Sequence, residues 1–134
     1  GMTAGTHGST YGGNPLGCAV GCAVMDHVTD PDFLAEVNRK AGLLRQKLEG
    51  LVAAHPDIFD HVRGLGLMLG LKCKAPNVDV VKAGYEQQIL TVPAADNVVR
   101  LLPALTISDD EIDAAVTRLD AAASAVSKSL KTPV

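Results

Sequence analysis

The chain has 134 residues, a length that suits one domain with its own hydrophobic core. Its net charge of −3 and pI near 5.7 provide no broad basic surface for a phosphate backbone, which argues against nucleic acid as a partner. The longest apolar run, residues 16–25, is about half of a bilayer span, and three cysteines form no disulfide framework, so we expect a cytoplasmic protein without a membrane segment.

Residues 5–15 form a glycine-rich opening loop, Gly-Thr-His-Gly-Ser-Thr-Tyr-Gly-Gly-Asn-Pro. The glycines permit close backbone approach, and Ser9 and Thr10 add hydroxyl groups that suit an oxyanion. The loop lacks the lysine of a nucleotide P-loop and the glycine spacing of a dinucleotide fold. From the pattern alone, phosphate binding and an ordinary loop before a helix both stay open. The preceding Gly1-Met2 is interpreted as a cloning remnant and an introduced start.

A first helix is predicted from Asn14-Pro15 to about Val28, because Asn caps free amides and Pro fits the first helical position. Its small residues predict a buried, closely packed helix. Cys18 and Cys22 stand four residues apart on it. We interpret them as small buried side chains rather than metal ligands, since no histidine or second cysteine pair stands at zinc-site spacing.

Two longer amphipathic helices are predicted. One begins at Thr29-Asp30-Pro31 and ends at His55-Pro56, and the other begins at the capping box of residues 108–111. Between them lie two extended segments with a glycine bend at residues 63–66, a short helix at 78–86, and strands at 89–92 and 98–102 around a turn at 95–97. We therefore predict an α+β fold in which two helices, starting near Asp30 and Ser108, cover a small, mostly antiparallel sheet. Residues 132–134 are expected to fray.

Two arginines are candidates for anion contact. Arg100 stands in an apolar stretch, residues 98–102, where an isolated guanidinium is costly without an anionic partner. A substrate carboxylate and a structural ion pair satisfy that need equally well from the residues alone. Arg63 is interpreted as a structural arginine that satisfies carbonyls at the glycine bend, and we leave it out of the site. The histidines have no triad or metal spacing and are interpreted as surface or loop residues: His7, His27, His55 and His61.

Three stretches carry a resemblance to a known family: residues 7–16, His-Gly-Ser-Thr-Tyr-Gly-Gly-Asn-Pro-Leu; residues 63–70, Arg-Gly-Leu-Gly-Leu-Met-Leu-Gly; and residues 99–105, Val-Arg-Leu-Leu-Pro-Ala-Leu. In this order they resemble the C-terminal third of class III pyridoxal-phosphate aminotransferases, most closely the acetylornithine aminotransferases. The resemblance implies a fold type I transferase, in which residues 30–134 are the C-terminal small domain and residues 3–29 are the cofactor loop and interdomain helix.

The resemblance also implies roles for individual residues. Thr10 is expected to contact the phosphate of pyridoxal 5'-phosphate bound in the neighbouring subunit of a homodimer, Ser9 to lie beside the substrate, and Arg100 to bind its α-carboxylate. None of the seven lysines stands in the glycine-rich context of the family's Schiff-base lysine. We therefore expect no catalytic residue in this chain and no activity of the chain by itself.

The implied activity of the parent protein is transfer of the amino group of N-acetylornithine to 2-oxoglutarate in arginine biosynthesis, with amino acids and 2-oxo acids as small-molecule partners. Two alternatives stay open. One is a fragment of an ornithine- or succinylornithine-type class III enzyme, and the other is a free-standing, non-catalytic module for binding or assembly. Because the first helix is normally covered on both sides in the family, we also expect the isolated chain to self-associate.

Overall fold

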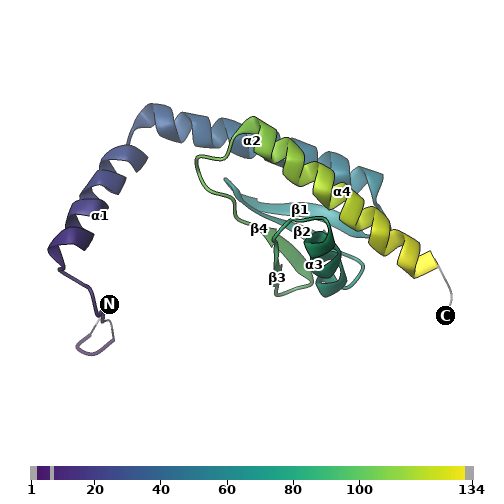
Figure 1. Ribbon diagram of the computed structural model, residues 1–134, viewed down its shortest axis with the longest axis horizontal. Helices are drawn as coiled ribbons and strands as arrows, with labels where there is room; N and C mark the ends of the chain where they lie inside the picture. Colours follow the sequence, from purple (N-terminus) through teal and green to yellow (C-terminus); the bar gives the residue numbers. More distant parts are fainter. Residues whose placement is uncertain (1–2, 7, 132–134) are drawn as a thin grey trace. The chain divides into compact units, whose positions relative to one another are not determined.

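The computed structural model describes residues 3–6 and 8–131. The expectations of a cloning remnant at Gly1-Met2, of a loop histidine at His7 and of a fraying end at residues 132–134 lie outside the described residues. The chain divides into two compact units, Gly1–Glu36 and Val37–Val134, which are described in turn. Figure 1 shows the elements of both units.

The first unit contains the opening loop and helix α1 (Pro15–Val28), which begins and ends as predicted. The Asn14 side-chain oxygen accepts the backbone N–H groups of Leu16 and Gly17 at 3.0 and 3.1 Å, which is the predicted cap. The prediction of a buried helix is wrong for this chain: no residue of α1 is buried, and Cys18 and Cys22 are exposed. Small side chains permit close packing, but no described residue covers them.

Helix α2 (Pro31–Ala54) begins at the predicted signal, because the Asp30 carboxylate accepts the N–H of Asp32 at 2.8 Å. It ends before His55, as the following proline requires. From residue 37 onward the predicted apolar stripe faces the core of the second unit, and its buried members are Val37, Leu44, Leu48 and Leu51.

The second unit contains a four-stranded antiparallel sheet in the order β1-β2-β4-β3. Its remaining elements are β1 (Phe59–Leu65), β2 (Met68–Cys73), α3 (Asn77–Glu86), β3 (Val92–Ala94), β4 (Val98–Leu101) and α4 (Asp109–Lys131). Figure 1 shows α2 and α4 running along the same side of this sheet. The predicted small antiparallel sheet with covering helices is thus confirmed.

The core lies between the sheet and the helices. Leu69 and Leu71 of β2 alternate with residues of the opposite face, and they pair with Leu101 and Val99 of β4; all four are at most 7% exposed. Helix α4 contributes its own buried stripe, of which Leu119 is 1% exposed. The opposite face of the sheet is therefore the one that α2 and α4 leave open.

The predicted capping box at the start of α4 is formed. Ser108 N–H donates to the Glu111 carboxylate at 2.8 Å, and Glu111 N–H donates to the Ser108 hydroxyl at 3.2 Å. The strand predicted at residues 89–92 is wrong in position, since β3 spans Val92–Ala94. Residues 89–91 instead close the end of α3: Ile89 N–H donates to the Gly84 carbonyl at 3.0 Å after Gln88, whose φ is 59°.

Candidate functional site

The open face of the sheet carries a row of three aligned residues from three strands. In the β1–β2 ladder Arg63 pairs with Gly70, and in the β2–β4 ladder Gly70 pairs with Arg100. Side chains of directly paired residues project from the same face, so the two arginines flank a glycine that has no side chain. The register therefore creates a gap between two guanidinium groups.

Gly70 keeps this gap open. A Cβ atom on Gly70 would lie 2.7 Å from Cγ1 of Val98 and 3.8 Å from Cγ of Arg63. The hollow above it has a volume of about 180 Å³, and Met68 and Ala94 are also among its lining residues. An alanine at position 70 would push Val98 aside and narrow the floor of the hollow. The hollow is thus a shallow site with an arginine on either side.

Asp96, in the turn between β3 and β4, engages two of the cations on this face. Its carboxylate accepts from Lys72 Nζ and from Arg63 Nη1, each at 2.7 Å, and its backbone carbonyl accepts from Lys72 Nζ at 2.5 Å. The hydrogen bonds from Lys72 and then Arg63 hold the pKa of Asp96 below its ordinary value. The interpretation of Arg63 as structural agrees with this ion pair, although its partner is Asp96 and not the carbonyls of the bend.

Arg100 is exposed, and within residues 3–6 and 8–131 its side chain makes no hydrogen bond or ion pair. The structural ion pair that the sequence left open for Arg100 is therefore absent from the described part of the chain. Exposure to water removes the desolvation cost that an isolated guanidinium would carry in a core. Arg100 is left able to bind an anion.

The opening loop presents the other two residues predicted for the site. Ser9 and Thr10 are adjacent and exposed, and neither hydroxyl group has a hydrogen-bond partner among the described residues. Gly5 and Gly13 have φ values of 82° and 79° and lie in turns on either side of this pair, closed by hydrogen bonds from Thr6 N–H to the Thr3 carbonyl at 3.2 Å and from Asn14 N–H to the Tyr11 carbonyl at 3.0 Å. The loop belongs to the first unit and Arg100 to the second. The structure thus brings Ser9 and Thr10 together in one loop and Arg100 together with Arg63 and Gly70 on the sheet.

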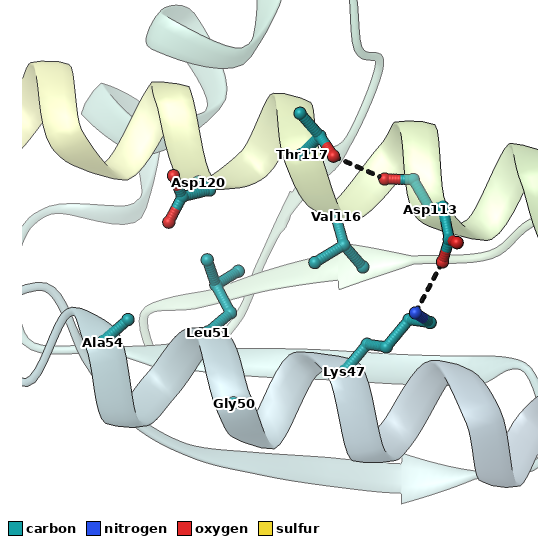
Figure 2. A pocket seen from close by; sticks show the side chains of 8 residues that line it. All are labelled: Lys47, Gly50, Leu51, Ala54, Asp113, Val116, Thr117 and Asp120. Atoms are coloured by element: carbon teal, nitrogen blue, oxygen red, sulfur yellow. Dashed lines mark hydrogen bonds and ion pairs between the residues drawn. The ribbon is translucent and has the colours of Figure 1, made fainter.

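A larger hollow of about 500 Å³ lies between α2 and α4, and Figure 2 shows its lining side chains. Its charges are already paired: Lys47 donates to Asp113 at 2.7 Å, and Asp120 lies 2.7 Å from Nε2 of His55. Such mutually satisfied groups have no need of a ligand. The His55 side chain is 12% exposed and lies in the loop after α2, which agrees with its interpretation as a surface or loop residue. The open face of the sheet remains the stronger candidate.

The described residues gather no metal site, and the one buried thiol is unreactive. No group of three or more His, Cys, Asp or Glu side chains is placed there to hold a metal ion. Burial raises the pKa of the Cys73 thiol to about 11, which keeps it protonated and unreactive. The candidate site is therefore one of hydroxyl groups and guanidinium groups, a combination that suits phosphate and carboxylate ligands.

Comparison with known proteins identifies the family of the chain. The family model described as aminotransferase class III matches residues 1–123, most of the chain. The chain belongs to the class III aminotransferase family. The acetylornithine aminotransferase of Rhodobacter capsulatus is 71% identical to it over 126 residues, which cover 94% of this chain and 32% of that protein.

Solved structures of aminotransferases have the same fold. The ornithine aminotransferase of Toxoplasma gondii matches with a TM-score of 0.80 and 32% identity, over 97% of this chain and 32% of that chain. The acetylornithine aminotransferase of Elizabethkingia anophelis matches with a TM-score of 0.77 and 29% identity, over 92% and 33%. This class III aminotransferase chain thus spans about a third of the length of its relatives, which agrees with the predicted C-terminal small domain of a fold type I transferase.

Sequence reasoning missed two residues of the open face, Gly70 and Asp96. Gly70 was visible only as the last residue of a glycine-containing motif, and its place between two arginines needs the register of both ladders. A signal for Asp96 was present, since an Asp-Asn pair between two apolar strands indicates a turn. The partners of its carboxylate do not follow from that signal.

Proposed function

We propose that this chain is the C-terminal part of a pyridoxal-phosphate-dependent aminotransferase that transfers the amino group of N-acetylornithine to 2-oxoglutarate in arginine biosynthesis. Residues 3–29 would be the cofactor loop and interdomain helix, and residues 30–134 the small domain. The observation that carries the proposal is the guanidinium of Arg100, which has no partner among the described residues, on a face where Asp96 engages Arg63 and Lys72. The name and 71% identity of the Rhodobacter relative support the choice of amino donor.

The chain provides part of a fit for pyridoxal 5'-phosphate. The Toxoplasma relative is described with partial occupancy of this cofactor at its active site. In this chain the Ser9 and Thr10 hydroxyl groups are exposed and have no hydrogen-bond partner among the described residues, which suits donation to a phosphate group. When bound, the cofactor supplies an electron sink for the amino acid's α-carbon. The lysine that the chemistry also requires has no counterpart here, so the rest of the site has to come from outside these 134 residues.

Each site residue has a defined task in this proposal. Thr10 donates a hydrogen bond to the cofactor phosphate in the neighbouring subunit of a homodimer, and Ser9 lies beside the substrate. Arg100 binds the α-carboxylate with two parallel N–H donors, which fixes the substrate's orientation as well as its position. None of these groups moves a proton. The chain therefore binds and orients, and we expect no aminotransferase activity from it alone.

Two features of the chain bear on assembly and location. Leu16, Val20 and Val24 recur every four residues on α1 and are 74%, 55% and 51% exposed, so they form an uncovered apolar stripe. We propose that this stripe makes the isolated chain self-associate, which sedimentation velocity would detect; a strict monomer at high concentration contradicts it. No described helix has the length and apolar character to cross a bilayer. We propose a cytoplasmic protein.

The test uses the longer protein that carries this sequence. Arg100→Ala is expected to raise KM for the amino-acid substrate by roughly ten- to hundred-fold, the loss of a charge-assisted contact of about 1.5 to 3 kcal/mol. Thr10→Val is expected to weaken cofactor affinity, and Ser9→Ala to have a milder effect. Arg118→Ala is the matched control, because Arg118 lies on α4 and donates to the Gln88 carbonyl at 2.6 Å. Unchanged constants in the Arg100 variant would refute its role.

The alternatives give different outcomes. A free-standing binding or assembly module would bind no pyridoxal phosphate and show no amino-group transfer even with its natural flanking sequence. An ornithine- or succinylornithine-type enzyme would transfer the amino group from those donors at a higher kcat/KM than from N-acetylornithine. Comparison of the three donors at a fixed 2-oxoglutarate concentration separates these cases.

A further inference from the structure

The open face of the sheet carries three cations, and one carboxylate holds two of them. We propose that Asp96 is a positioning residue that sets how many cations this face presents to an anionic ligand. It holds Arg63 and Lys72 in ion pairs, so that Arg100 is the contact for a single carboxylate group of the ligand. The inference deepens the proposed function, and its ligand class, small mono- and dicarboxylates, rests on that function.

The side chain of Arg63 lies beside the hollow in which Arg100 would bind its ligand. Its Cγ atom lies 3.8 Å from the position that a Cβ of Gly70 would take, so its aliphatic stem already lies beside the glycine floor. Both arginines line the same hollow. Only the terminal guanidinium of Arg63 is committed elsewhere, to Asp96 at 2.7 Å. Rotation of that end group away from Asp96 would place a second cation in the hollow that Arg100 also lines.

Asp96 is well suited to hold cations, because the fold fixes it in place. Its φ of 60° and the φ of 51° at Asn97 put both residues in the left-handed region of the turn. The Asn97 side chain donates to the backbone carbonyls of Cys73 and Ala75 at 2.8 and 2.9 Å. A carboxylate on such an anchored turn loses little further freedom when it forms ion pairs. The hydrogen bonds from Lys72 and then Arg63 also lower the pKa of Asp96 below its ordinary value.

The substitution Asp96→Asn tests this role with little disturbance of the backbone. Asparagine tolerates the left-handed conformation as well as aspartate does. The variant loses the negative charge, so Arg63 and Lys72 lose their counter-ion. An anion at Arg100 then meets a more positive face, and a dicarboxylate gains a second contact that a monocarboxylate cannot use. Exposed ion pairs have modest energies, which sets the expected gain at about two- to five-fold in affinity.

The experiment titrates the 134-residue chain with glutarate and with valerate, which have five carbons each and differ in one carboxylate. NMR of the arginine side-chain Nε–Hε signals reports Arg63 and Arg100 separately. In the wild type both acids are expected to shift Arg100 alone. In Asp96→Asn, glutarate is expected to bind about two- to five-fold more tightly and to shift Arg63 as well, with a smaller gain for valerate.

Two further variants serve as controls. Asp60→Asn makes the same charge change in β1, where Asp60 lies 3.0 Å from Nδ1 of His61, and is expected to leave the wild-type pattern unchanged. The double variant Asp96→Asn with Arg63→Gln is expected to lose the additional gain for glutarate. A gain in Asp60→Asn equal to that in Asp96→Asn would reduce the effect to net charge and overturn the inference.

The outcomes separate this inference from the proposed function. If the Arg100 signal shifts in every variant while the Arg63 signal does not shift in Asp96→Asn, the proposed role of Asp96 is wrong and that of Arg100 stands. If Asp96→Asn recruits Arg63 while Arg100 never responds, the role of Arg100 is wrong and that of Asp96 stands. An equal response of Arg63 in the wild type and in Asp96→Asn also overturns the inference.

Discussion

Asn97 and Asn77 join the β3–β4 turn to the start of α3. The Asn97 side-chain oxygen accepts the backbone N–H of Asn77 at 2.8 Å, and its side-chain nitrogen donates to two carbonyls that follow β2 or end it. Asn77 returns two hydrogen bonds from its own side chain to carbonyls of the β3–β4 hairpin, at 3.0 and 2.8 Å. The turn that presents Asp96 is therefore fixed to its neighbours by side-chain amides.

Asn97→Ala is expected to destabilise the chain by about 2 to 4 kcal/mol, because it removes three hydrogen bonds and places a Cβ-bearing residue without a polar side chain in the left-handed region. Asn97→Gly is the matched variant. It loses the same hydrogen bonds but adopts positive φ freely, so its loss should be about 1 kcal/mol smaller. Urea unfolding followed by circular dichroism measures both. Equal stability of Asn97→Ala and the wild type would show that the network contributes nothing.

Two glycines are expected to respond to alanine in opposite directions. Gly64 has a φ of 119°, and a Cβ there would lie 2.1 Å from the Met68 carbonyl oxygen, so Gly64→Ala must distort the β1–β2 hairpin and destabilise it by more than about 1 kcal/mol. Gly50 lies on α2 (Figure 2), and a Cβ there would have no atom of another residue outside its own helix turn within 4 Å, so Gly50→Ala should stabilise the chain by about 0.5 to 1 kcal/mol. The two unfolding midpoints should therefore move apart. A loss of stability in Gly50→Ala would contradict this expectation.

Much of the fold could be predicted because helix ends depend on neighbouring residues alone. Asn14 before Pro15, and Ser108 three residues before Glu111, each specify a helix start within one turn of chain, and both caps are present. Strand position is less local. β3 exists only where β4 lies opposite, so Val92 pairs with Arg100, while residues 89–91 are drawn to the end of α3. This long-range pairing is why the predicted strand was misplaced.

The candidate site was less accessible from the sequence than the fold. Arg100 is recognisable as an unusual charge in an apolar strand. Whether its guanidinium lacks an ion-pair partner depends on the direction of the nearest acidic side chain. That acid, Asp96, lies four residues away and bonds to Arg63 and Lys72 instead. The exposure of Cys18 was also missed, because small residues predict close packing without identifying the segment that packs.

Thr91→Val is expected to stabilise the chain by about 1 kcal/mol. Thr91 is 7% exposed, and among the described residues its hydroxyl oxygen has no hydrogen-bond partner. Burying an unsatisfied hydroxyl costs free energy that a methyl group of the same shape does not. Thr117→Val is the control, since that exposed hydroxyl donates to the Asp113 carbonyl at 2.9 Å, and it should not stabilise the chain. A lower urea midpoint for Thr91→Val would indicate that the hydroxyl has a partner in solution.

Acid is expected to weaken the start of α4 through Glu111. The hydrogen bonds from the Ser108 backbone and side chain hold the pKa of Glu111 below its ordinary value of 4.5. A carboxyl group whose pKa is lower in the folded chain stabilises the fold fully above the unfolded pKa, and this contribution is lost as the pH falls through the folded pKa. The urea midpoint should therefore be level between about pH 7 and 5 and should decrease below about pH 4, which is the acid limb of the profile.

Glu111→Gln keeps an acceptor for the capping box without this titration and should flatten the acid limb. Asp110→Asn removes a carboxyl group from the same turn without touching the Ser108 hydrogen bonds, and it should flatten the limb less. An acid limb that is as steep in Glu111→Gln as in the wild type would assign the acid sensitivity to other carboxyl groups.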